Sequence, residues 1–93
     1  MSEVVWTDPA PATLEAIRIY IEQFNPRAAR QLAVSLVEAG NSLAQFQHRG
    51  RPVPGTDMRE LVTSYPYIIR YQVIGDEVVI LRVRHGARRP TDP

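Results

Sequence analysis

The sequence contains no cysteine, no lysine and no long uninterrupted apolar run. Without cysteine, the chain has no disulfide framework, no thiolate zinc site and no cysteine nucleophile. A membrane-spanning helix needs about 20 consecutive apolar residues, and no segment of that length is present. The N-terminus, MSEVVWTDP, lacks the basic and apolar regions of a signal peptide. We therefore expect a cytoplasmic protein without a membrane partner.

The 93 residues suffice for one domain with a modest core, and we expect a single domain over residues 1–93. The net charge of +1 conceals an asymmetry: residues 1–46 carry three arginines and five acids, whereas residues 47–93 carry eight arginines and five acids. The exclusive use of arginine fits either a GC-rich genome or a need for guanidinium groups that bind carboxylates and phosphates. The basic half therefore suits an acidic partner, but the overall balance does not favour direct specific DNA binding.

The first half of the chain predicts one strand and two helices. Residues Glu3 to Thr7 are β-prone. Asp8-Pro9 and Asn25-Pro26 each combine a capping residue with a proline suited to a first helical turn. Apolar residues then recur at helical spacings: Leu14, Ile17, Ile21 and Phe24 in the first helix, and Ala29, Leu32, Leu36, Ala39, Leu43 and Phe46 in the second. We expect an antiparallel helical hairpin that ends at His48–Pro52, with Gly50 as a left-handed cap.

A loop, Pro52–Asp57, and three strands are predicted in the second half: Met58–Thr63, Tyr67–Ile74 and Val78–His85. A two-residue turn at Gly75-Asp76 would mix polar and apolar side chains on each face of the last two strands. A three-residue loop, residues 75–77, separates them, so we predict that loop. The inner face then carries Ile69, Tyr71, Val73, Val79, Leu81 and Val83, and the outer face carries Ile68, Arg70, Gln72, Val78, Ile80, Arg82 and Arg84. The predicted fold is α+β, with an N-terminal β-strand, the helical hairpin and a three-stranded antiparallel sheet.

Catalytic and metal-binding motifs are sparse. The two histidines, His48 and His85, occur without cysteine and without metal-binding spacing, so no metal or cofactor is predicted. His85 with Arg82, Arg84 and Arg88 could supply a base, an acid and cations for RNA cleavage. Alternatively, His85 ends a strand while the arginines pair with acids of a partner. We favour the second interpretation.

Several segments in order carry a family resemblance: Gly50-Arg51, Arg59-Glu60-Leu61, Pro66-Tyr67 with Tyr71, and Arg82-Val83-x-His85-Gly86-Ala87-Arg88. Together they resemble the RelE/ParE superfamily of bacterial toxins from type II toxin–antitoxin pairs. The resemblance extends from Trp6 to Pro90. It implies a curled antiparallel sheet with a helical hairpin on one side.

The resemblance implies different activities for the two branches of this superfamily. RelE-like members are ribosome-dependent endoribonucleases, with a basic residue on the strand beside the tyrosine motif and an aromatic or His-Tyr pair near the C-terminus. Here Ile68 matches that strand position, and the tail Arg89–Pro93 has no tyrosine. The RGRPVPG loop and the HGAR ending resemble the ParE branch. Its studied members inhibit DNA gyrase and have no recognised catalytic set.

We therefore predict a ParE-like toxin that inhibits DNA gyrase by binding, rather than by catalysis, and is neutralised by a ParD-like antitoxin. Such antitoxins usually carry an acidic, partly disordered C-terminal segment that folds on binding. We expect this segment to cover the apolar helical surface and to pair with Arg59, Arg70, Arg82, Arg84 and Arg88. The alternatives are a RelE-like mRNA endonuclease and a toxin that has lost its activity but still binds an antitoxin.

Overall fold

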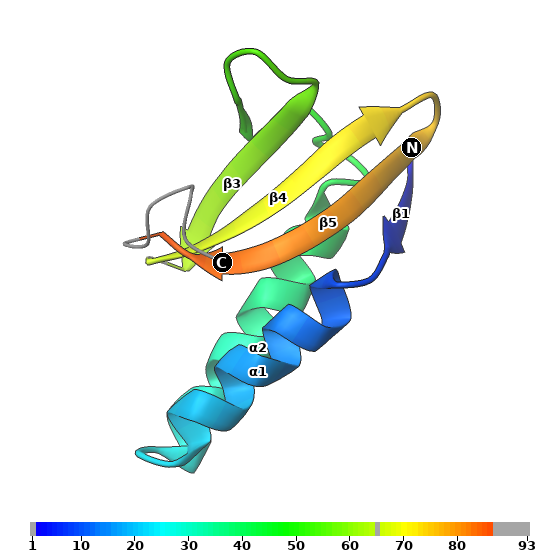
Figure 1. The fold of residues 1–93 in the computed structure, drawn as a ribbon. Helices are drawn as coiled ribbons and strands as arrows, with labels where there is room; N and C mark the ends of the chain where they lie inside the picture. Colours follow the sequence, from blue (N-terminus) through cyan, green and yellow to red (C-terminus); the bar gives the residue numbers. More distant parts are fainter. Residues whose placement is uncertain (1, 65, 87–93) are drawn as a thin grey trace.

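A helical hairpin packs against one face of a five-stranded sheet (Figure 1). The computed structural model describes residues 2–64 and 66–86. The elements in chain order are β1 (Glu3–Trp6), α1 (Ala10–Glu22), α2 (Pro26–Ser42), β2 (Arg51–Pro52), β3 (Met58–Ser64), β4 (Tyr67–Ile74) and β5 (Glu77–His85). Across the sheet the strand order is β1-β5-β4-β3-β2. The predicted α+β class, the N-terminal strand, the helical hairpin and the three C-terminal strands are confirmed.

β1 makes the sheet mixed rather than fully antiparallel. It pairs in parallel with β5, with Val4 opposite Val78, whereas β2, β3, β4 and β5 pair in antiparallel fashion. Parallel neighbours need a long crossover connection, and the chain between β1 and β5 includes the helical hairpin. The wholly antiparallel sheet implied by the family resemblance is therefore wrong at β1. The prediction also omitted β2, a short strand that pairs with β3.

The β4–β5 hairpin has a two-residue turn, so the predicted three-residue loop is wrong. Ile74 lies opposite Glu77, and Gly75 and Asp76 alone form the turn. Gly75 has a φ of 58°, a left-handed conformation that glycine adopts without a steric penalty. A glycine at the first central position of a two-residue hairpin turn is a common arrangement.

A β-bulge in β5 restores the predicted register farther from this turn. Tyr71 pairs with Ile80, whereas Arg70 pairs with Arg82, so Leu81 is the extra residue. A bulge shifts the alternation of side chains by one position. The predicted register therefore holds on the far side of the bulge and fails on the side near the turn.

The core lies between the helices and the inner face of the sheet. Its largest fully buried side chains are Leu36, Leu43, Ile69, Tyr71, Val78, Ile80 and Val83. Because of the bulge, Val78 and Ile80 are buried where Val79 and Leu81 were predicted. Leu14, Ile17 and Leu32 pack against this cluster, in agreement with the helical stripes. Phe24 is the exception in the first stripe, because α1 ends at Glu22 and Phe24, which lies beyond it, is 72% exposed.

α1 begins without the predicted aspartate cap. Its N-cap residue is Pro9, and no side chain forms a capping hydrogen bond. The backbone carbonyl of Thr7 instead accepts a hydrogen bond from the Ala10 N–H at 2.7 Å. Asp8 is exposed and does not cap the helix.

α2 begins with the predicted cap and ends earlier than predicted. The Asn25 side chain accepts a hydrogen bond from the Ala28 N–H at 3.0 Å. The helix ends at Ser42, so Phe46 lies beyond it and is 59% exposed instead of buried in the apolar stripe. Leu43 is buried as predicted. We call residues 44–50, which connect α2 to β2, the linker.

Gly50 permits close packing and is not a left-handed helix cap. Its φ does not lie in the positive region. A Cβ atom at Gly50 would lie 2.7 Å from the ring and the hydroxyl of Tyr71. In α2, a Cβ atom at Gly40 would collide with the ring of Trp6. These two glycines therefore let the linker and α2 approach the sheet.

Candidate partner-binding surface

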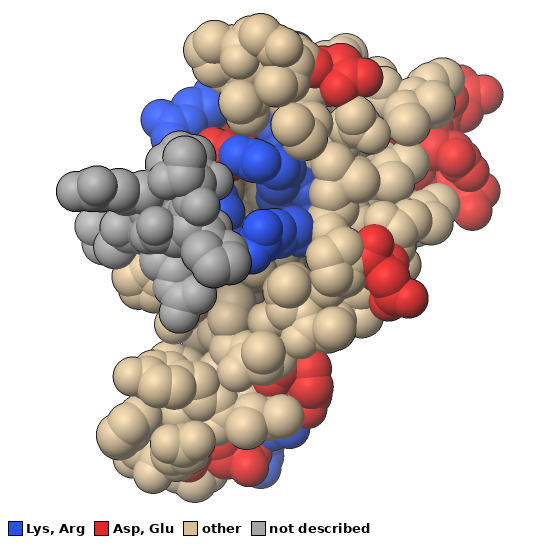
Figure 2. All heavy atoms as spheres, viewed as in Figure 1, with Lys and Arg blue, Asp and Glu red and all other residues tan. Residues whose placement is uncertain are grey.

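Four charged side chains gather on the face of the sheet opposite the helices, which is the outer face. The strand register places Glu60 opposite Arg70 and Arg70 opposite Arg82. Strand alternation puts Arg84 on the same face as Arg82. We name Glu60, Arg70, Arg82 and Arg84 the outer-face cluster, and Figure 2 shows arginine side chains gathered on this face. The fold thus brings together three of the five predicted antitoxin-binding residues.

Glu60 is the buried anion that holds this cluster together. Its Oε2 accepts hydrogen bonds from Arg70 Nη2 at 2.7 Å, from Arg70 Nε at 3.1 Å and from Arg84 Nη2 at 3.0 Å. Burial by itself raises the pKa of Glu60, but the hydrogen bonds and charges of the two arginines outweigh that effect, and the pKa is lowered. Glu60 is therefore ionised at neutral pH and fixes the positions of both guanidinium groups.

Arg82 is the arginine of the cluster to which the described residues supply no anion. It lies directly opposite Arg70, and like charges in that position repel each other. Within the part of the chain that the structure describes, Arg82 forms no ion pair, and its buried Nε has no hydrogen-bond partner. Three guanidinium groups and one carboxylate leave the cluster with a net charge of +2. Arg82 is therefore the point at which an incoming carboxylate or phosphate would be stabilised most.

Arg59 does not lie with the other predicted arginines. It is opposite Tyr71 in the register, on the inner face of the sheet. Its Nη1 donates hydrogen bonds to the carbonyl oxygens of Gly50 at 2.7 Å and His48 at 3.3 Å. Arg59 thus holds the linker backbone against the inner face of the sheet through these two carbonyls. Arg88 lies outside the described residues.

His85 does not lie with the arginines that were considered as its catalytic partners. It is opposite Tyr67 in the register, and the two rings meet edge to face with centroids 5.3 Å apart. Tyr67 belongs to the buried core on the inner face. Strand alternation therefore directs His85 away from the face that carries Arg82 and Arg84.

The helical hairpin extends beyond the edge of the sheet (Figure 1), and exposed aromatic side chains lie near its end. Tyr20 lies in the last turn of α1 and Phe24 lies just beyond its end, with ring centroids 5.5 Å apart in an edge-to-face arrangement. They are 60% and 72% exposed. Two large apolar rings exposed side by side are typical of a surface that a partner covers. Among the described residues of the helical hairpin, these two rings are the most exposed large apolar side chains.

Sequence reasoning missed two residues that organise these surfaces. Glu60 was noted only as part of a family motif, although its neighbours on the same strand face, Met58 and Val62, are apolar, and an acid in such a position is rarely buried unless it is paired. Tyr71 was assigned to the core, but its hydroxyl also donates a hydrogen bond to the Gln47 carbonyl at 2.8 Å and accepts one from the Gly50 N–H at 2.8 Å. Burial raises the pKa of Tyr71, so its hydroxyl stays protonated and able to donate.

Other classes of site were sought in the same residues. Across residues 2–64 and 66–86, no group of three or more histidine, aspartate or glutamate side chains is arranged to hold a metal ion. No helix in these ranges is long and apolar enough to span a membrane.

Comparison with known proteins identifies the class of this protein and then its family. The sequence matches the family described as "ParE toxin of type II toxin-antitoxin system, parDE" over residues 4–90. The protein is thus a toxin of the RelE/ParE superfamily, and within that superfamily it belongs to the ParE toxin family of type II toxin–antitoxin systems. The recognised superfamily is therefore confirmed.

Individual relatives carry names from both branches of the superfamily. The chain is 51% identical over 88 residues to "Toxin RelE2" of Caulobacter vibrioides, covering 95% of this chain and 99% of that protein. A structure described as "Chromosomal ParDE TA system from P. aeruginosa" matches with a TM-score of 0.82 and 30% identity, covering 91% of this chain and 96% of that chain. The isolated E. coli RelE toxin shares the fold, with a TM-score of 0.58 and 18% identity over 97% of this chain and 89% of that chain.

Proposed function

We propose that this toxin acts in the cytoplasm by binding and inhibiting DNA gyrase. The observation that carries the proposal is the separation of His85 from Arg82 and Arg84 on opposite faces of the sheet. RNA cleavage by 2′-OH attack needs a general base close to the cations that stabilise the phosphorane. The carboxylate of the outer face, Glu60, is already bound by two guanidinium groups. The arrangement supports a surface that binds a partner rather than one that cleaves RNA.

A supercoiling assay with purified gyrase tests this proposal. Free toxin should block the supercoiling of relaxed plasmid, and adding the cognate antitoxin should restore it. Unchanged supercoiling at toxin concentrations that stop growth in vivo would refute the proposal. If inducing the toxin without antitoxin leaves growth normal as well, the chain has lost its toxic activity.

A RelE-like mRNA endonuclease is the second candidate, because the relative with 51% identity is named Toxin RelE2. On this hypothesis His85 and the arginines at positions 82, 84 and 88 would contribute to cleavage. Primer extension on a message in translating ribosomes separates the two candidates. Codon-specific cuts combined with unaffected supercoiling would favour the endonuclease, whereas inhibited supercoiling without cuts supports the first proposal.

The proposed inhibitor of the toxin is a ParD-like antitoxin with an acidic segment. The family to which the chain belongs comes from toxin–antitoxin pairs, and the outer-face cluster has an excess of positive charge. An acidic side chain that reaches Arg82 would pair with its guanidinium group, to which the described residues supply no anion. Apolar residues of the same antitoxin would cover Tyr20 on α1 and Phe24 just beyond its end.

Charge reversal at Arg82 tests the antitoxin contact. Arg82→Glu should weaken antitoxin binding by about tenfold or more, because a carboxylate would meet a carboxylate in a partly desolvated site. Arg27→Glu, on the exposed start of α2, makes the same change of charge away from the cluster and should have little effect. Equal affinities for the two variants, measured by calorimetry, would remove the outer face from the antitoxin interface. Arg88→Glu tests the remaining predicted position.

A further inference from the structure

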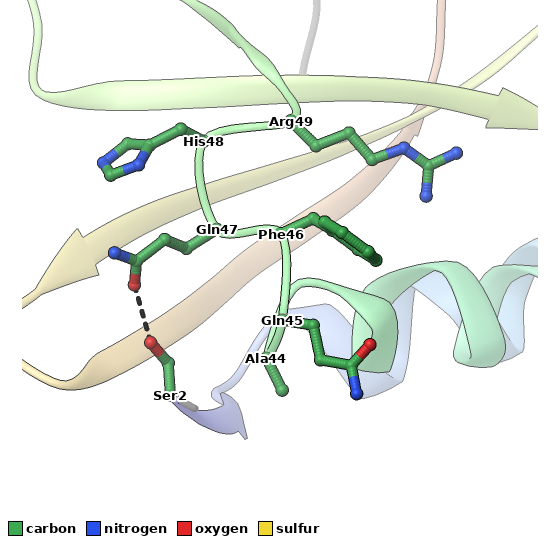
Figure 3. Close-up of a pocket in the computed structure, with 7 residues that line it drawn as sticks. All are labelled: Ser2, Ala44, Gln45, Phe46, Gln47, His48 and Arg49. Carbon is green, nitrogen blue, oxygen red and sulfur yellow. Dashed lines mark hydrogen bonds between the residues drawn. The ribbon is translucent and has the colours of Figure 1, made fainter.

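The linker lies beside an open depression that the proposed function does not use. The depression has a volume of about 730 Å³ and is lined by Ser2 and residues 44–49 (Figure 3). The Phe46 side chain is 59% exposed there. By contrast Tyr71, which also contacts the linker, is fully buried. An exposed aromatic ring in a lined depression is suited to contact with a flat apolar ligand surface.

A tight turn places a cation beside this ring. The Arg49 N–H donates a hydrogen bond to the Phe46 carbonyl at 3.0 Å, which closes a four-residue turn and brings its two ends together. Figure 3 shows Phe46 and Arg49 extending to the same side of the linker, with Gln47 and His48 on the other. Arg49 Nη1 donates to Ser42 Oγ at 3.2 Å. Across the described residues, Arg49 forms no ion pair.

The backbone that presents these two side chains is held in place from the sheet. The buried Tyr71 hydroxyl bridges the Gln47 carbonyl and the Gly50 N–H. The Arg59 guanidinium binds the carbonyls of His48 and Gly50. A segment fixed in this way loses little additional conformational entropy when it binds a ligand. The linker is therefore ordered before binding, although its own side chains are largely exposed.

The charge of this region points to an anionic ligand. Residues 44–56 contain no aspartate or glutamate, and they include Arg49, Arg51 and His48. Amide side chains of Gln45 and Gln47 line the depression next to them. A planar ring and one guanidinium group, that of Arg49, on the same side of the linker match the base and the phosphate of a nucleotide.

We propose that the linker depression binds a nucleotide unit of single-stranded nucleic acid, with its base stacked on Phe46 and its phosphate bound by Arg49. Stacking and phosphate contacts carry no sequence information, so binding is not sequence-specific. This agrees with the expectation that the protein does not bind specific DNA sequences. The site lies on the linker, apart from the outer-face cluster, and does not depend on whether gyrase or the ribosome is the target.

An acidic peptide fits the depression less well than a nucleotide. A carboxylate would pair with Arg49 but would leave the face of the Phe46 ring in water. A nucleotide supplies the phosphate and the flat base on neighbouring atoms of one unit. Because every base has such a face, both RNA and DNA strands can supply the ligand, and the two are compared directly in the test.

Fluorescence anisotropy with short labelled single strands of RNA and of DNA, titrated with the full-length free toxin, tests the site. Phe46→Ala should weaken binding about tenfold, whereas Phe24→Ala removes a ring elsewhere that is more exposed still and should not. Arg49→Gln should reduce the slope of log affinity against log salt by about 0.7, the value for one phosphate on a single strand. Arg30→Gln, an exposed charge on α2, should leave the slope unchanged. Circular dichroism confirms that each variant is folded.

Three results would overturn the site. The first is an absence of binding by either strand at low salt. The second is a loss of affinity that is equal for Phe46→Ala and Phe24→Ala. The third is equal binding of a blunt duplex, whose paired bases cannot stack on Phe46, or of a polyglutamate peptide that depends on the same ring. A preference for RNA over DNA, with the same dependence on Phe46 and Arg49, would support the site and identify the source of the strand.

Discussion

The outer-face cluster and the linker both present arginines to solvent, but they hold them in different ways. In the cluster, a buried carboxylate fixes two guanidinium groups, so the charges are part of the structure. In the linker, the Tyr71 hydroxyl and Arg59 fix the backbone, and the charge of Arg49 is not used for that purpose. Loss of charge should therefore cost stability in the first region and only binding in the second.

Glu60→Gln should produce the largest effect, lowering the free energy of unfolding by about 3 kcal/mol, because it leaves two partly buried guanidinium groups without their anion. Their side chains are only 24% and 15% exposed. Urea denaturation at neutral pH measures the change. Glu38→Gln, an exposed charge on α2, is the matched control and should change stability by less than about 0.5 kcal/mol. Similar values for the two variants would mean that the ion pairs of the cluster do not stabilise the fold.

Tyr71→Phe tests the linker side of the comparison and should cost about 2 kcal/mol, because it leaves a buried N–H and a buried carbonyl without their partner. The N–H belongs to Gly50 and the carbonyl to Gln47. Tyr20→Phe, which removes an exposed hydroxyl, serves as the control in the same urea titrations. Faster hydrogen exchange confined to the linker would locate the loss. An unchanged exchange rate there would show that the hydroxyl does not hold this segment.

The sequence predicted the order and type of the main elements because each has a strong local signal. The helical stripes, the Asn25 cap and the strand boundaries depend on spacing and turn residues that lie close together in the chain. The register near the turn was wrong because a bulge at Leu81 has no local signature in the sequence. Pattern reasoning sought one register for the whole β4–β5 hairpin, whereas the chain uses two.

The candidate surfaces were predicted only in part, because they depend on pairing between strands. Alternation within β5 correctly grouped Arg82 with Arg84, and the register added Arg70. Arg59 was grouped with them by its charge alone, since nothing in its local sequence shows that it binds linker carbonyls. The end of α2 was predicted too late because Phe46 continues the helical spacing. Its exposure follows from contacts between the linker and the sheet that are distant in sequence.

Acid should weaken the cluster, with an effect smaller than that of either substitution at neutral pH. The folded-state pKa of Glu60 is lowered from its usual 4.5, so the unfolded state binds the proton more tightly. The stabilisation by Glu60 is therefore complete above the unfolded pKa and is lost as pH falls through the folded pKa. In urea titrations from pH 7 downward, the difference in stability between wild type and Glu60→Gln should stay constant above pH 4.5 and shrink as the pH falls below it. A difference that stays constant throughout would show that this carboxylate is not the titrating group.

Arg82→Gln should have the smallest effect on stability, within about 0.5 kcal/mol of wild type, although it lies in the cluster that holds the other two arginines rigidly. Arg82 has no anion to lose among the described residues, and its removal relieves repulsion with Arg70 across the strand pair. Arg70→Gln breaks a contact with Glu60 and should cost more. Thermal denaturation of both variants, alongside their affinity for the antitoxin, separates structural arginines from binding ones. If Arg82→Gln proves the less stable of the two, Arg82 is structural and the proposed antitoxin contact loses its physical basis.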